Sequence, residues 1–125
     1  MTARISGGAA ASDETRIKAL ALFREAEVGF AELGDSKSLF FADLQSEIAR
    51  TLAADGGQDP EVRAEAIAAL KLCDQIYRSK NRHESVAHLR RLRHLVELLG
   101  DQDCQEDLAI YRPRLQRLEQ MFPDE

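Results

Sequence analysis

Residues 59–79, DPEVRAEAIAALKLCDQIYRS, carry the clearest helix signature in the chain. Asp59 is a typical N-cap residue, Pro60 suits the first helical position because no backbone N–H is lost there, and Glu61 complements the positive end of the helix dipole. Apolar residues then recur with the spacing of one helix face. They are Val62, Ala66, Ala69, Leu70, Cys73 and Tyr77. The stretch therefore predicts an amphipathic helix that ends near Ser79.

Four further segments with helical periodicity flank this stretch, at residues 12–33, 36–54, 81–99 and 103–122. The third of these starts at Asn81 or Ser85, and Gly100 is expected to stop it. Pro113 is expected to kink the last segment or restart it at Arg112. The residues expected to face the core are Ala19, Leu22, Phe23, Ala26, Phe30 and Leu33; Phe40, Phe41, Leu44, Ile48 and Leu52; Val86, Leu89, Leu92, Val96 and Leu99; and Leu108, Tyr111, Leu115, Leu118 and Phe122.

The whole pattern predicts an all-α fold, with about five amphipathic helices in a compact antiparallel bundle or in stacked helical hairpins. No alternating run of β-branched and aromatic residues indicates a strand. A length of 125 residues suits one domain. We expect residues 1–11 to form a disordered tail and residues 12–122 to form a single helical domain.

The composition also bears on location. No apolar run approaches the roughly 20 residues that a membrane-spanning helix needs, and the N-terminal MTARISGGAAAS has no apolar core of a signal peptide. Cys73 and Cys104 lack a CxxC spacing and are expected to be reduced thiols. These features predict a cytoplasmic protein that does not bind a membrane.

A faint internal repeat suggests a resemblance to a known family. Residues 19–35, ALALFREAEVGFAELGD, and residues 66–77, AIAALKLCDQIY, each begin with an Ala-rich turn and reach an aromatic residue eleven positions later. The segment from Leu22 to Asp35 resembles the first helix and turn of tetratricopeptide-like repeats, and the resemblance covers residues 19–52. It departs from that family in lacking its Trp/Leu-Gly-Tyr pattern and a proline before Gly56. The resemblance implies stacked helix pairs whose inner groove holds a peptide of a partner.

The charge distribution is the main functional signal. Residues 78–94, RSKNRHESVAHLRRLRH, hold six basic residues and one acidic residue, whereas the whole chain has a net charge of −5. Such an asymmetry predicts a docking surface for something acidic. Arginine and tyrosine are residue types that contribute strongly to interfaces. The predicted partner-binding residues are Arg78, Arg82, Arg90, Arg91, Arg93 and Tyr111.

We therefore expect a non-catalytic protein–protein interaction module, of the regulator, adaptor or chaperone class, whose partner is acidic or helical. A nucleic-acid partner is not expected, because the sequence pI is near 5.2 and no aromatic residues alternate with the basic ones. A homodimer or larger homo-oligomer, in which the last helix pairs with its twin, is a further alternative.

A second resemblance gives another alternative. His88 followed by Arg91 is similar to the reactive histidine and basic residue of histidine phosphotransfer domains, but Leu92 stands where that family has glycine. His88 is thus an alternative phosphoacceptor. We expect no enzyme activity, no cofactor and no metal site, since no nucleophile or phosphate-loop motif occurs and the histidines are five and six residues apart.

Overall fold

The computed structural model describes the backbone of residues 2–55 and 59–125 and the side chains of residues 17–54 and 59–125. Within these ranges the chain forms five helices and no strand, which confirms the predicted all-α class. The helices are α1 Thr2–Glu32, α2 Leu39–Asp55, α3 Pro60–Ser79, α4 Val86–Asp101 and α5 Gln105–Met121.

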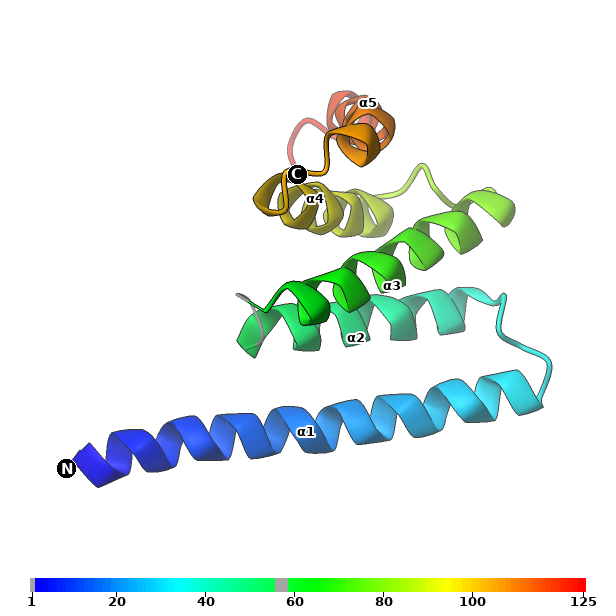
Figure 1. Ribbon diagram of the computed structural model, residues 1–125. Coiled ribbons are helices and arrows are strands. Elements are labelled where there is room, and N and C mark those ends of the chain that lie inside the picture. The colour runs from blue at the N-terminus through cyan, green and yellow to red at the C-terminus, as the bar shows by residue number, and fades with distance from the viewer. Residues whose placement is uncertain (1, 56–58) are drawn as a thin grey trace.

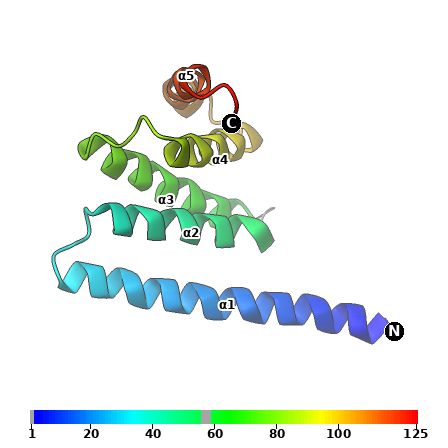
Figure 2. The same cartoon turned by 180° about the vertical axis from the view of Figure 1, so that it is seen from behind.

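The five helices are stacked in the order of the sequence, with α1 and α5 at opposite ends (Figures 1 and 2). Their backbones approach closely between chain neighbours, most of all between α2 and α3. Ion pairs also connect alternate helices in the stack. Arg24 of α1 pairs with Glu65 of α3, and Lys71 of α3 pairs with Asp107 of α5, each at 2.8 Å.

Two side chains fix where helices begin. The Asp59 carboxylate accepts a hydrogen bond from the backbone N–H of Glu61 at 3.0 Å, so α3 starts as predicted. The hydroxyl of Ser85 accepts from the backbone N–H of His88 at 3.2 Å, which selects Ser85 rather than Asn81 as the cap of α4. Asn81 instead has a left-handed backbone with φ of 57° and lies just after α3.

The core lies between α2, α3, α4 and α5. The leucines of α4 are its centre, because α4 packs against both α3 and α5. Within the last helix, Leu108 and Leu118 are buried, and Tyr111, Leu115 and Phe122 pack against the core. The apolar stripe proposed as a dimer contact is therefore used inside the molecule.

The structure differs from the sequence predictions at the ends and along the outer faces of helices. Helix α1 begins at Thr2, upstream of residue 12, where we expected the first helix to start; Met1 lies outside the described residues. No proline interrupts this segment and residues 9–11 are alanines, which favour a helix. Leu22, Leu33 and Phe40 are exposed, although we expected them to face the core. For Leu22 and Leu33 the reason is that α1 ends the stack and packs mainly on α2. On α2, Phe41 rather than Phe40 faces the core.

Two predicted helix breaks are also wrong. Helix α5 runs without interruption through Pro113, so it does not restart at Arg112. Proline removes the hydrogen bond to the carbonyl of Ala109, but Ala109 is exposed, so water can satisfy that carbonyl. Gly100 lies inside α4, which ends one residue later.

Candidate functional site: a divided basic stretch and a buried polar network

The predicted partner-binding residues do not form one surface. Four of the six line two grooves on different pairs of helices. Arg78 and Tyr111 line a groove between α3 and α5, whereas Arg90 and Arg91 line a groove between α2 and α4. Arg82 is exposed in the connection between α3 and α4, and Arg93 contacts the last residues of the chain.

The Arg91 side chain contacts residues of two other helices. Its guanidinium lies 2.8 Å from the carboxylate of Asp43, donates a hydrogen bond to the hydroxyl of Tyr77 and stacks over the Tyr77 ring at 5.0 Å. The Tyr77 hydroxyl in turn donates to Asp43 at 2.7 Å. Burial is the main reason that the pKa of Tyr77 is raised, and its hydrogen bond to Asp43 adds to the effect. Arg91 therefore joins α4 to α2 and α3.

Arg90 and Arg93 contact the acidic end of the chain instead. Arg90 lies 3.0 Å from the carboxylate of Glu125, and Arg93 donates to the backbone oxygen of Glu125 at 2.6 Å. Arg93 also lies 3.6 Å from the carboxylate of Glu119. The side chain of Arg90 is 71% exposed, against 21% for Arg91. We call Arg90 and Arg93 the α4 basic surface.

The groove between α2 and α4 adjoins Arg90. It has a volume of about 440 Å³ and contains three arginines, Arg50, Arg90 and Arg91, but one acidic residue, Glu47. His94 also lines it, and burial is the main reason that the pKa of His94 is lowered, with Arg50 adding to the effect and Glu97 opposing it. The groove thus carries positive charge in a chain that is acidic as a whole.

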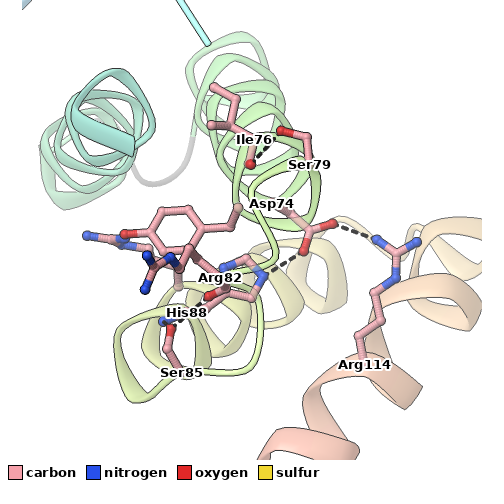
Figure 3. A network of polar contacts seen from close by, with 9 residues as sticks. Asp74, Ile76, Ser79, Arg82, Ser85, His88 and Arg114 are labelled. Atoms are coloured by element: carbon pink, nitrogen blue, oxygen red, sulfur yellow. Dashed lines mark hydrogen bonds and ion pairs between the residues drawn. The ribbon is translucent and has the colours of Figure 1, made fainter. Parts of the chain in front are cut away.

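A buried polar network joins α3, α4 and α5. Figure 3 shows Asp74 of α3 between His88 of α4 and Arg114 of α5. One Asp74 oxygen lies 2.7 Å from Nε2 of His88, and the other accepts from Arg114 at 2.5 Å. Asp74 is 3% exposed and His88 is 1% exposed. The His88 ring stacks on Tyr77 with 5.1 Å between ring centroids, so the network adjoins the Arg91 cluster.

This network joins three helices through one carboxylate. A buried carboxylate is tolerated only when it is paired and hydrogen-bonded, and both Asp74 oxygens have a partner. Nδ1 of His88 is buried and has no hydrogen-bond partner among the residues that the structure describes. With both ring nitrogens buried, a phosphate donor has no path to His88 in this structure. The phosphotransfer alternative needs an exposed imidazole.

Cys73, the residue before Asp74, lacks the lowered thiol pKa of a reactive cysteine. Burial is the main reason that the pKa of Cys73 is raised to about 12. Its thiol is thus protonated at neutral pH, whereas a nucleophilic or metal-binding cysteine acts as the thiolate. Among residues 17–54 and 59–125, no three His, Cys, Asp or Glu side chains gather as they would around a metal ion.

The sequence analysis missed Asp74 and Arg114. The position of Asp74 in the sequence indicates that it is buried. It follows Leu70 by four residues and precedes Tyr77 by three, on the predicted buried face of α3. A carboxylate in that position requires a partner. His88 gave the matching signal on α4, where it shares a face with Leu92, Leu95 and Leu99.

Searches of family models, curated proteins and solved structures found no match to this chain. In the described part of the chain, none of the helices has the length and apolar character that crossing a membrane demands. The arguments on function below therefore come from the residues themselves.

Proposed function

We propose that this protein is a non-catalytic protein-binding module, of the regulator, adaptor or chaperone class, that docks an acidic segment of a partner protein on the α4 basic surface. The observation that carries the proposal is the contact of Arg90 and Arg93 with the chain's own acidic residues, Glu119 and Glu125. These contacts are an internal example of the recognition that we propose for a partner.

The internal contacts are weak enough to be exchanged. Exposed ion pairs contribute about 0–1 kcal/mol to stability, because water solvates both charges and the long side chains lose entropy. Arg90 is largely exposed, as is typical of such a pair. A partner that supplies several carboxylates can therefore replace Glu125 at little cost.

The adjoining groove extends the contact area. Arg50 adds a third accessible cation near Arg90, although it pairs with Glu47 in the same groove. Leu70 and Ala87 supply apolar contact. A short acidic helix or extended segment with small apolar residues matches this combination of charge and shape.

The proposal is tested with a labelled peptide that copies residues 118–125, LEQMFPDE, and a control peptide with its acids replaced by amides. Fluorescence anisotropy would be measured on the wild-type chain and on the variant Glu119→Gln/Glu125→Gln. We expect this variant to bind the acidic peptide more tightly than the wild type, because the two competing side-chain carboxylates are neutralised. The control peptide should bind neither protein measurably.

Two receptor variants with equal charge change test the location. Arg90→Glu/Arg93→Glu, made in the Glu119→Gln/Glu125→Gln background, should abolish peptide binding. Lys80→Glu/Arg82→Glu, made in the same background, should retain most of it, since these exposed residues lie in the α3–α4 connection. Equal loss in both would show that net charge alone attracts the peptide, and retention in the first would contradict the proposed surface.

A further inference from the structure

A small pocket lies apart from the α4 basic surface, where the end of α3, the α3–α4 connection and α5 meet. It has a volume of about 220 Å³ and shares no lining residue with the groove between α2 and α4. Three arginines and three apolar residues supply most of its wall; they are Arg78, Arg114, Arg117, Leu92, Pro113 and Leu118. The pocket thus combines positive charge with an apolar surface.

The three guanidinium groups differ in how far they are already paired with acidic side chains. Arg78 is exposed and forms no ion pair with any acidic side chain that the structure describes. Arg114 gives one nitrogen to Asp74, which leaves further N–H donors on its guanidinium. Arg117 binds the exposed carboxylate of Glu84 through two nitrogens, at 2.8 and 2.9 Å.

His83 also lines this pocket, and one of its ring nitrogens has no partner among the described residues. This nitrogen is Nδ1, and it is buried. Buried polar atoms in native proteins are nearly always paired, so such an atom indicates a missing partner.

We propose that this pocket binds a small anion in which a carboxylate or phosphate group is attached to a compact apolar body. Arginine guanidinium groups bind such oxyanions with paired N–H donors, and Leu92, Pro113 and Leu118 provide the contact for the apolar body. Glu84 occupies part of the charge site in the absence of the anion, since its carboxylate already holds Arg117. The hydrogen bond from Arg117 is also the main reason that the pKa of Glu84 is lowered.

The probes are phenyl phosphate and benzoate, with inorganic phosphate as the charge-only control and benzyl alcohol as the apolar control. Binding to the full chain would be followed by two-dimensional NMR of the backbone amides. We expect saturable shifts at residues 83–85 and 114–118 with phenyl phosphate or benzoate, and binding at least tenfold weaker for each control. The tighter of the two probes identifies the preferred anionic group.

Three exposed side chains give variants whose effects differ in sign. Arg78→Gln should weaken binding about tenfold, since the anion loses a charged hydrogen-bond donor. Glu84→Gln should tighten binding several-fold, because it releases Arg117. Arg82→Gln, with the same charge change as Arg78→Gln, should leave the affinity unchanged, because Arg82 does not line the pocket.

Circular dichroism of each variant would verify that the helices are intact. The proposal is overturned if inorganic phosphate binds as tightly as phenyl phosphate, if Arg82→Gln weakens binding as much as Arg78→Gln, or if Glu84→Gln fails to tighten it. Arg90→Glu/Arg93→Glu should not change phenyl phosphate binding, so this result is independent of the proposed function.

Discussion

Helix α4 carries two groups of basic residues that differ in what they contact. His88 and Arg91 contact Asp74, Asp43 and Tyr77 in or near the core. Arg90 and Arg93 instead contact exposed acids near the end of the chain. Arg90 and Arg91 are adjacent in sequence, yet one is accessible and the other joins helices. The excess of basic residues in this stretch thus contains two groups, one that joins helices and one that pairs with acids at the surface.

The largest expected effect comes from removing the shared carboxylate of the buried network. Asp74→Ala leaves His88 and Arg114 without an acceptor, and breaking a buried pair in this way typically costs about 3–5 kcal/mol. Urea unfolding followed by circular dichroism would measure the loss. The control is Asp107→Ala, whose pair with Lys71 is half-exposed and should contribute less than about 1 kcal/mol. Similar losses in the two variants would mean that the Asp74 network adds no special stability.

The adjacent arginines provide the sharpest test of the comparison. Arg91→Gln should lower the free energy of unfolding by about 1–3 kcal/mol, because Asp43 and Tyr77 lose a charged partner. Arg90→Gln should change it by less than about 1 kcal/mol. Both changes remove one positive charge, so the difference reports the environment alone. Thermal and urea unfolding of the pair would measure it, and equal stabilities would contradict the assignment of Arg91 to the interior.

Replacing His88 should have a smaller effect on stability. We also expect that His88 itself is not phosphorylated. In His88→Gln the amide nitrogen can still donate to Asp74, so we expect a loss of about 1 kcal/mol, mainly from the missing contact with Tyr77. The wild-type protein incubated with acetyl phosphate should carry no acid-labile, base-stable phosphate on His88, since the ring is buried. Detection of that phosphate by mass spectrometry would restore the phosphotransfer alternative.

The smallest expected effect concerns pH and His94. Burial places the folded-state pKa of His94 below its ordinary value of 6.5, so the unfolded chain takes up a proton at a higher pH than the folded one. This contribution to stability is present above pH 6.5 and is lost as the pH falls toward the folded-state pKa. The melting temperature should therefore drop less between pH 7.5 and pH 5.5 in His94→Gln than in the wild type. An identical drop in both proteins would show that other groups dominate.

Local signals predicted some features of this molecule well. The start of α3 followed from Asp59 and Pro60, because capping depends on residues that are close in sequence. The buried face of α3 followed from its periodicity, since five of its six predicted positions are buried and Val62 packs against the core.

The remaining features depend on how helices are placed against one another. Arg114 is 40 residues from Asp74, and their contact exists only because α5, which packs on α4, also reaches α3. Similarly, the division between Arg90 and Arg91 depends on which side of α4 meets α2. Leu33 is 83% exposed because no helix lies beyond α1 in the described structure. Periodicity identifies a face, but it cannot say what covers that face.

The sequential order of the stack also affects how the chain reaches its folded state. Because most backbone contacts join helices that are neighbours in the chain, the loops that must close are short. Domains with such local contacts fold in microseconds to milliseconds, since little chain entropy is lost before each contact forms. We expect each helix to assemble on its predecessor, with the pairing of Asp74 and Arg114 completed only when α5 docks. The buried carboxylate would then act late in folding, and its removal would mainly speed unfolding rather than slow folding.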